Sequence, residues 1–567
     1  MTSNVTLNKP DQGVVSAETL AMLALCVVVY AYISNAFTGQ NLHVWGDEIT
    51  YSIESRQLDF KNSTYPVFLY LGLFHFAHIA HQGFLELARS MNAALLALSV
   101  PFIYFTAAAF TTRKRSLLIS AVTVLGPITT YGAYFMPDAM YFTVFWIFAW
   151  FVLTRSKISP VAYGAGVGLL AGLSAMVKPH ATFLLLGFIA AQIVLTICTQ
   201  TKPAFRRNAI SSGISLVAFA IARIGCGWYF GGEKGLSLFG AYTDYANVKW
   251  NTEKLTEAAH LCGILLRGHF VGLVLLSGPA ILALSIPLRC DVDRREDLIR
   301  FRTFAVCTIT VMFFISVLFS VRIADGAPFV DTMRVHMRYY NLFFPLLYIS
   351  VAVFADAKYQ VPRIVWPISA VLMFAVLSIG FGSLDRFAFL QLDSPELRGL
   401  VANRTLLNFS WIFSLLSIAL FTYRQSLGAK IYLLLALPIM ALLGSYFVNN
   451  DLKVRFVDLP GDVAGKVVRI QLAEDSSHIG FFGDVVSIYQ AMFYAGDRRS
   501  FTYKLADGEP VPAILKPGLP VPGQLLPPGQ LMPSGTRWIV VFGKRPVPDN
   551  YELFFKSSEW ALFRVLK

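Results

Sequence analysis

Charged residues are scarce in this sequence. Only 14% of its 567 residues are Asp, Glu, Lys or Arg, whereas 56% are hydrophobic, and the mean hydropathy is +0.58. A typical soluble domain is about one quarter charged. The shortage of charge therefore excludes a soluble globular protein and predicts a polytopic membrane protein.

Several common functional motifs are also missing. The six cysteines form no CxxC pair and lack the spacing of zinc ligands, which argues against a disulfide framework or a zinc cluster. The glycine-rich stretch at 231–235 lacks the strand and helix that flank a phosphate-binding loop. No short apolar segment with a cleavage site follows the polar residues 1–18, so we expect the first span to be a retained anchor. The cysteines lie in or beside apolar segments and are expected to pack there: Cys26, Cys198, Cys226, Cys262, Cys290 and Cys307.

Long apolar segments, by contrast, recur between Thr19 and Phe447. A helix needs about 20 apolar residues to cross the hydrocarbon layer of a membrane. On this basis the predicted spans are 19–37, 86–110, 117–135, 139–154, 160–177, 181–200, 209–230, 262–287, 303–321, 340–355, 364–382, 405–423 and 429–447. The chain is thus expected to cross the membrane about 11 to 13 times.

Basic residues between these spans all fall on one side of the predicted membrane. Because short cytoplasmic loops are enriched in Lys and Arg, that side is expected to be the cytoplasm. The net charge of +13 is then an orientation signal and does not indicate nucleic-acid binding. With an odd number of spans, the N-terminus is expected inside and residues 448–567 outside. The basic residues are Arg113, Lys114, Arg115, Arg155, Lys157, Lys202, Arg206, Arg207, those from Arg289 to Arg302, Lys358, Arg363, Arg424 and Lys430.

Two adjacent carboxylates, Asp47 and Glu48, follow the first apolar segment. At a membrane edge an acid must stay hydrated, pair with a cation or take part in chemistry. An ordinary solvated loop is the alternative interpretation. The pair belongs to a predicted outer loop, 38–85, whose apolar part at 65–76 predicts amphipathic helices along the membrane surface rather than another span.

Two further charged residues lie where a proline separates predicted spans at the outer edge. They are Asp138 in Met-Pro-Asp and Lys178 in Val-Lys-Pro. Proline ends a helix and leaves the neighbouring charge at the turn. Asp138 could instead be a simple helix cap, and Lys178 could extend its amine to the membrane interface.

A cluster of cations precedes the predicted span at 340–355, at Arg334, His336 and Arg338, followed by Tyr339. Cations on the outer side are unusual, because Lys and Arg of membrane proteins are enriched in cytoplasmic loops. Guanidinium groups suit a phosphate because their planar fork can donate two parallel hydrogen bonds. Anionic lipid headgroups are the alternative ligands.

After Phe447 the sequence becomes mixed, and residues 448–567 are expected to form a small α/β domain on the outer face. It contains no nucleophile elbow and no metal motif, so we expect it to contact substrate or support the fold rather than to catalyse. Its predicted elements are strands at 466–472 and 538–542, a helix at 484–494 and an extended loop at 509–534.

Together these features resemble the GT-C superfamily of membrane glycosyltransferases, which includes protein O-mannosyltransferases and the aminoarabinose transferase that acts on lipid A. The resemblance rests on Asp47-Glu48 with Tyr51 after it, on the semi-apolar helices of the same loop, on the Glu86–Arg89 opening of the next span, and on Arg338-Tyr339 before a late span. It implies an α-helical polytopic module at 1–447 followed by an extracytoplasmic α/β domain at 448–567.

The resemblance also implies a reaction. GT-C enzymes move a sugar, usually with inversion, from a polyprenyl-phosphate carrier to an acceptor at the outer face of the membrane, here expected to be a bacterial inner membrane. Asp47 would be the base on the acceptor hydroxyl, and Glu48 would orient Asp47 or the acceptor, or help hold a divalent ion. Arg338 and Lys178 would steady the phosphate of the leaving carrier. The remaining expected substrate-binding residues are Tyr51, Asp138, Arg334, His336 and Tyr339.

Three other functions compete with this interpretation. A glycan polymerase or ligase would use a larger lipid-linked donor at the same kind of site. A lipid or solute transporter would place ionisable residues near the middle of the membrane, whereas here they gather at the outer edge. A non-enzymatic assembly subunit would tolerate loss of the acidic pair. The expected partners are the lipid-linked donor of a hexose or pentose, membrane lipids, and a glycan, lipid or protein acceptor.

Overall fold

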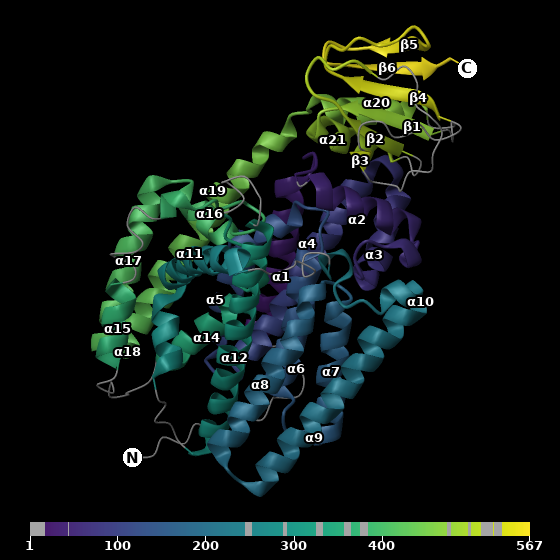
Figure 1. Ribbon diagram of the computed structural model, residues 1–567. Helices are drawn as coiled ribbons and strands as arrows, with labels where there is room; N and C mark the ends of the chain where they lie inside the picture. The colour runs from purple at the N-terminus through teal and green to yellow at the C-terminus, as the bar shows by residue number, and fades with distance from the viewer. Residues whose placement is uncertain are drawn as a thin grey trace.

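The protein is a bundle of helices with a small sheet domain at one end (Figure 1). The structure, a computed structural model, describes the residue ranges 17–43, 45–243, 252–286, 292–324, 333–355, 365–374, 384–472, 478–496, 500–511, 525–526 and 536–566. In the view of Figure 1 the strands lie at the top and the start of α9 lies at the opposite end.

Eight helical segments in the described part of the chain are long and apolar enough to cross a membrane. Their outward side chains include large exposed hydrophobic residues such as Ile197, Val217 and Leu318, which are suited to contact lipid tails. The protein is therefore a multi-pass membrane protein, as the composition predicts. The segments are α1 (Ala17–Phe37), α4 (Phe84–Ala108), Pro179–Thr199 with α8 (Thr182–Thr199), Lys202–Gly235 with α9 (Lys202–Phe219) and α10 (Cys226–Gly235), α11 (Thr252–Ser285), Arg295–Ile323 within α12 (Val292–Ala324), α17 (Arg404–Tyr423), and Gln425–Phe456 with α18 (Gln425–Ile431) and α19 (Leu437–Leu452).

Shorter helices account for other predicted spans. They are α6 (Asp138–Thr154), α7 (Pro160–Ala175), α14 (Phe344–Phe354) and α15 (Val365–Phe374). The predicted span 117–135 is wrong as one helix, because α5 (Arg113–Val124) ends before Pro127 and a short 3-10 turn (Pro127–Gly132) follows. Residues 375–382 of the predicted span 364–382 lie outside the described residues.

The two ends of helix α6 show where the basic turns lie relative to the predicted site. Just beyond its last residue, Ser156 accepts hydrogen bonds from Arg207 and Arg300, and Lys157 pairs with Asp297 at 3.4 Å. These contacts gather three of the basic turns at one end of the bundle. Asp138 begins α6 at its other end, and 17 helical residues span about 25 Å. The basic turns and the predicted site therefore lie at opposite ends of the bundle.

Small residues bring α7 close to α9, and α7 leads directly into the turn that carries Lys178. A Cβ built on Gly164 or Gly168 would meet backbone atoms of α9, and one built on Gly172 would come within 2.7 Å of the Cβ of Ala222, in the segment that continues α9. Glycine at this spacing lets two membrane helices approach closely. The position of the Lys178 turn is thus set by tight helix packing.

The connection between α1 and α4 forms three short helices: α2 (Trp45–Gln57), α3 (Phe68–His75) and a 3-10 segment, η2 (Phe76–Gly83). None is among the candidate membrane spans. In Figure 1 α2 lies next to the sheet domain, with α3 below it. The ring of Phe84, at the start of α4, lies 5.2 Å from that of Phe493 in α21 (Val485–Ala495), a helix of the sheet domain. The prediction of short helices rather than a span in this loop is confirmed.

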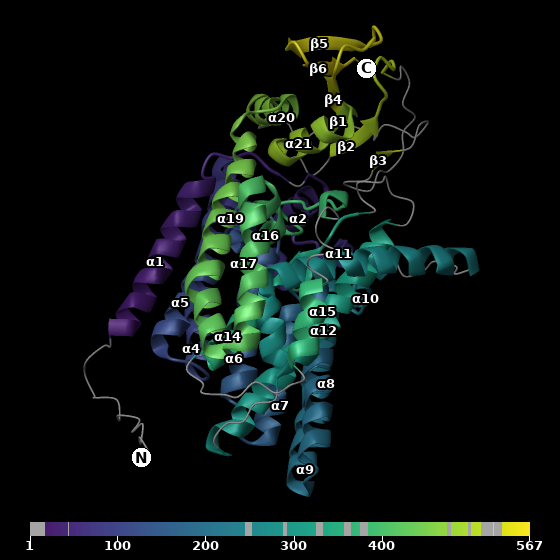
Figure 2. The same ribbon diagram turned by 90° about the vertical axis from the view of Figure 1, so that its left-hand side faces the viewer.

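The C-terminal domain contains a six-stranded sheet with the order β3-β2-β1-β4-β6-β5. Neighbours among the first four strands run parallel, and β6 is antiparallel to both β4 and β5. Figure 2 shows helices α20 and α21 at the base of the strands, next to the bundle. The elements are β1 (His478–Gly483), β2 (Ser500–Lys504), β3 (Leu525–Leu526), β4 (Thr536–Phe542), β5 (Tyr551–Lys556), β6 (Trp560–Val565), α20 (Pro460–Gln471) and α21 (Val485–Ala495).

The strand at 538–542 and the helix at 484–494 are confirmed, but the predicted strand at 466–472 is wrong. Those residues belong mostly to α20, which starts with Pro460 and buries Ala464 and Val468, four residues apart on one face. Their Val and Ile content favoured a strand, but the buried residues repeat with the spacing of a helix, and the segment is helical. Most of the predicted loop at 509–534 lies outside the described residues.

Candidate active site

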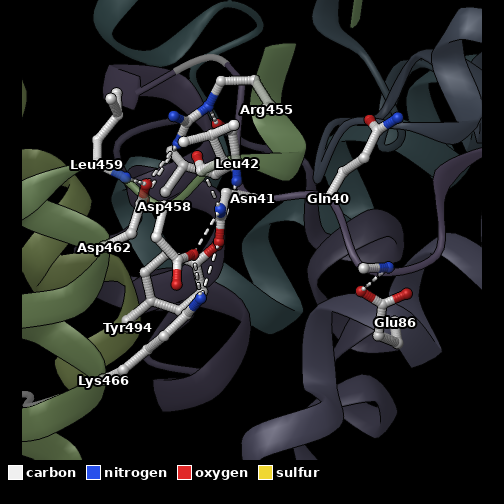
Figure 3. A network of polar contacts seen from close by, with 12 residues as sticks. Gln40, Asn41, Leu42, Glu86, Arg455, Asp458, Leu459, Asp462, Lys466 and Tyr494 are labelled. Atoms are coloured by element: carbon white, nitrogen blue, oxygen red, sulfur yellow. Dashed lines mark hydrogen bonds and ion pairs between the residues drawn. The ribbon is translucent and has the colours of Figure 1, made fainter. Parts of the chain in front are cut away.

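The segment that leads to the acidic pair is fastened to the sheet domain through Asn41 (Figure 3). The Asn41 backbone N–H donates to the carbonyl of Arg455 at 2.8 Å, and its side-chain amide donates to Asp458 at 2.8 Å. The Asn41 side-chain oxygen accepts from the Tyr494 hydroxyl at 2.8 Å and from Lys466 at 3.0 Å. One asparagine thus joins the α1–α2 connection to both helices of the C-terminal domain.

Arg89 of α4 holds the same connection from the bundle side. Its buried guanidinium donates to the carbonyls of Gln40 at 2.5 Å, Asn41 at 3.0 Å and Ala133 at 3.0 Å. It also pairs with Glu86 at 3.2 Å, three positions earlier on the same helix. Arg89 therefore fixes the start of the acidic loop against the turn that precedes α6.

The two acids of the pair have different surroundings. Glu48 is fully buried, and its carboxylate oxygens accept backbone N–H groups from His43 at 2.8 Å and from Phe135 at 2.7 Å. Asp47 is only half-buried, and within the part of the chain that the structure describes its carboxylate accepts no hydrogen bond. Adjacent helical residues point about 100° apart, so Asp47 remains open to a substrate while Glu48 holds α2 in place.

Substitution of Glu48 by Gln is expected to destabilise the protein. The change leaves one of the two backbone N–H groups opposite an amide NH2, and a lost hydrogen bond to a buried charged group costs about 1.5–3 kcal/mol. Thermal unfolding of the purified protein should show a lower Tm for Glu48→Gln and an unchanged one for Glu552→Gln, an exposed residue on β5. Equal Tm values for Glu48→Gln and wild type would contradict this structural role.

The predicted residues Asp138 and Lys178 form a buried ion pair, with Nζ and Oδ1 2.5 Å apart. Lys178 also lies 5.6 Å from the ring centre of Tyr141 and 5.0 Å from that of Tyr339. The second carboxylate oxygen of Asp138 has no hydrogen-bond partner among the described residues. The amine is therefore turned inward toward an acid and two aromatic faces, and burial lowers the pKa of Lys178.

Arg338 lies in the segment between α12 and α14 and is 7% exposed. Its backbone N–H donates to the Asp393 carbonyl at 2.8 Å, and its Nε lies 3.3 Å from an Asp393 carboxylate oxygen. Its Nη2 reaches the Tyr339 hydroxyl at 3.4 Å. Its Nη1 has no hydrogen-bond partner within the described part of the chain. A buried guanidinium nitrogen without an acceptor is suited to receive an anion.

Arg334 and His336 surround Asp393 rather than presenting a second open cation. Arg334 donates to the Asp393 carboxylate at 3.0 and 2.5 Å. His336 is fully buried, with Nδ1 2.7 Å from the Ser320 hydroxyl and Nε2 3.9 Å from the same carboxylate. These residues hold the aspartate that anchors Arg338, which is a positioning role.

Asp393 was not predicted from the sequence. It lies two positions before Pro395, which begins α16 (Pro395–Val401), whereas Asp138 directly follows a proline, so both acids lie close to a proline. Its partner Arg334 lies 59 positions earlier. The acid-proline pattern could have singled it out as a candidate, but only the fold identifies its partners.

Tyr51 lies one turn beyond the acidic pair on α2 and is buried. Its ring lies 5.4 Å from that of Tyr70 and 5.8 Å from that of Tyr65. These contacts pack α2 against α3. In this structure Tyr51 therefore supports the loop helices, while Tyr339 contributes the aromatic face beside Lys178 and Arg338.

The charges of the site act on one another across five separate segments. Burial raises the pKa of Asp47; Arg338 and Lys178 lower it, whereas Asp138 and Asp393 raise it. The net shift is upward, which is the direction that suits a general base working near neutral pH. Asp47 is thus within the electrostatic influence of Arg338 and Lys178, and these two cations lie 5.3 and 5.0 Å from the ring centre of Tyr339. Among the described residues, no group of three or more His, Cys, Asp and Glu side chains is arranged to hold a metal ion, and the divalent ion remains a prediction.

An apolar groove of about 800 Å³ runs between α11 and α12. Its wall includes Leu266, Phe270, Phe313 and Leu347. The ring of Phe313 lies 5.6 Å from that of Tyr340, two residues after Arg338. One residue of the groove wall therefore contacts the segment that carries Arg338.

Comparison with solved structures identifies the fold. ArnT from Cupriavidus metallidurans bound to undecaprenyl phosphate aligns with a TM-score of 0.53 and 13% identity, over 96% of this chain and 97% of that one. The same protein in the apo state aligns with a TM-score of 0.52 and 13% identity, over 97% and 98% of the two chains. No protein-family model and no curated protein sequence matches the chain. The chain has the same fold as ArnT, a helical membrane module followed by a small sheet domain, which confirms the fold class expected from the sequence.

Proposed function

We propose that the protein is an inverting glycosyltransferase that moves a hexose or pentose from a polyprenyl-phosphate carrier to an acceptor hydroxyl at the outer face of a bacterial inner membrane. The observation that carries the proposal is an open carboxylate, Asp47, together with a buried guanidinium, Arg338, one of whose nitrogens has no hydrogen-bond partner among the described residues. Such a pair supplies a base for the acceptor and a cation for the leaving phosphate.

The surroundings support a lipid-linked donor. A polyprenyl chain needs an apolar surface next to the site of its phosphate, and the groove between α11 and α12 offers one. ArnT, whose fold this chain shares, was solved with undecaprenyl phosphate bound. The site also lies at the end of α6 rather than at its middle, whereas transporters bind their substrates near the middle of the membrane.

The reaction follows from these positions. The phosphate of the donor would sit against Arg338 and Lys178, with its tail in the groove. Asp47 would accept the proton of the acceptor hydroxyl as that oxygen attacks the anomeric carbon from the face opposite the phosphate. The new bond joins the acceptor oxygen to the sugar, and the bond from the sugar to the phosphate oxygen breaks. The polyprenyl phosphate leaves with the electron pair, and Arg338 stabilises its added negative charge. Glu48 and Asp393 would hold the base and the cation in place.

Mass spectrometry of the cell envelope tests this proposal. Cells that lack the chain are compared with cells that carry wild type or Asp47→Asn. We expect a polyprenyl-phosphate sugar to accumulate, and one sugar to be absent from an envelope glycan, lipid or protein, in both defective strains. Identical envelopes and identical lipid-linked sugars in all three strains would contradict the proposal. The missing sugar and its attachment point would identify donor and acceptor.

A further inference from the structure

A second pocket lies beside the loop helices, where they meet the C-terminal domain. Its volume is about 330 Å³. Two arginines and three histidines line it, and none of its described lining residues is acidic. We call it the basic pocket, and its lining residues are Arg56, His75, His78, Ile79, His81, Phe84, Arg469, Ala495 and Gly496.

The basic pocket is assembled from three parts of the chain. Arg56 comes from α2 and donates to the Ser52 hydroxyl at 3.0 Å. It lies against Gly496, where an added Cβ would come within 2.5 Å of its Nη1. Arg469 comes from α20 and lies 5.8 Å from the ring centre of Phe84, on which the His78 ring also stacks at 5.0 Å. Both guanidinium groups are thus held in place by packing.

The arginine on α20 forms no ion pair within the described residues. Burial lowers the pKa of Arg469. At the rim of the pocket His81 has a backbone φ of 49°, in the left-handed region that a residue with a side chain rarely adopts. Such conformations concentrate at ligand-binding sites. Two arginines in one pocket, of which Arg469 is half-buried and forms no ion pair among the described residues, and a strained rim together indicate a site for an anion.

The edge of the basic pocket is suited to a membrane surface. Phe76 and Ile79 of η2 are 58% and 65% exposed, and they belong to the same segment as His78 and His81. Exposed apolar side chains on a surface helix enter the boundary between headgroups and acyl chains. The basic groups would then lie at the level of the lipid phosphates.

We propose that the basic pocket binds the phosphate headgroup of an anionic lipid on the side of the membrane where the sheet domain lies. This site is separate from the candidate active site. Asp47 and Arg56 lie on the same helix, nine positions apart, which corresponds to about 13 Å along the axis. A lipid bound there would fasten α2 and α20 to the membrane surface and so fix the height of Asp47 above it.

Native mass spectrometry of the purified, delipidated full-length protein tests this proposal. The protein is incubated with equal amounts of phosphatidylglycerol and phosphatidylcholine, and the ratio of the two retained lipids is measured. Wild type should retain more phosphatidylglycerol. The double variant Arg56→Gln/Arg469→Gln should lower this preference by about five-fold for each guanidinium removed. The control Lys504→Gln, at an exposed position on β2, should leave it unchanged.

Two further arms make the result decisive. Arg56→Lys/Arg469→Lys keeps the charges and should keep most of the preference, which separates lipid binding from misfolding. Asp47→Asn should retain phosphatidylglycerol as wild type does, so that loss of transfer and loss of lipid binding are distinguishable. A wild-type lipid ratio in the double Gln variant would overturn the proposal. So would displacement of phosphatidylglycerol by an equal concentration of inorganic phosphate, because the site would then bind a soluble anion.

Discussion

Sugar transfer should be lost when Asp47 is replaced by Asn, while the protein stays folded. The amide has nearly the shape of the carboxylate but cannot accept a proton from the acceptor hydroxyl. Removing a general base lowers kcat by about 100- to 10,000-fold. The Asp47 carboxylate accepts no hydrogen bond from the described residues, so the substitution removes no hydrogen bond to them. Release of polyprenyl phosphate by the purified protein in proteoliposomes measures the effect.

The pH dependence gives a second readout of the same residue. A base works only when deprotonated, and burial raises the pKa of Asp47. The wild-type rate should therefore rise with pH through that raised pKa and then level off, whereas the residual rate of Asp47→Asn should lack this rise. Asp59→Asn, at an exposed acid of the same loop, should behave as wild type does. Full activity of Asp47→Asn would refute the assignment of the base.

Substitution of Arg338 by Ala should mainly impair use of the lipid-linked donor. Arg338 is buried, and its Nη1 is free of hydrogen bonds within the described residues, so an arriving phosphate would meet a desolvated cation. Truncating one partner of a buried charge pair costs about 2–5 kcal/mol, and a loss of 2–4 kcal/mol corresponds to a fall of about 30- to 1,000-fold in kcat/KM for the donor.

Two companion variants sharpen the Arg338 test. Arg338→Lys keeps the charge but not the planar fork, so its kcat/KM should lie between those of wild type and Arg338→Ala. Arg404→Gln removes an exposed arginine that pairs with Asp385 at 3.5 Å and should leave donor use unchanged. If Arg338→Ala depends on donor concentration as wild type does, Arg338 does not contact the donor.

The sequence predicted which charged residues lie at turns at the membrane edge, but not which contacts they make. A proline beside a charge marks a turn at a membrane edge, and this local pattern identified Asp138 and Lys178. The ion pair between them depends on how α6 packs against the turn after α7. The sequence allowed Asp138 to be a helix cap and Lys178 to reach the membrane interface. Their burial as an ion pair results from the packing of helices, which one sequence does not reveal.

The different surroundings of Asp47 and Glu48 also could not be predicted from the sequence. Two adjacent acids look equivalent in sequence, yet within the described residues Glu48 accepts hydrogen bonds from two backbone N–H groups and Asp47 from none. The difference depends on the rotation of α2 about its axis, and that rotation is set by distant residues such as Asn41, Arg89 and Arg455. Asp393 was missed for a related reason, because the partners that make it important lie more than fifty positions earlier.

A structure of the full-length protein with undecaprenyl phosphate, determined by cryo-electron microscopy in nanodiscs, tests the central claim most directly. The account predicts that the phosphate lies within hydrogen-bonding distance of Arg338 Nη1, near Lys178, that the polyprenyl chain runs along the groove between α11 and α12, and that the Asp47 carboxylate faces the space beside the phosphate. A phosphate bound at the opposite end of α6, or an Asp47 side chain turned away from the bound lipid, would contradict it.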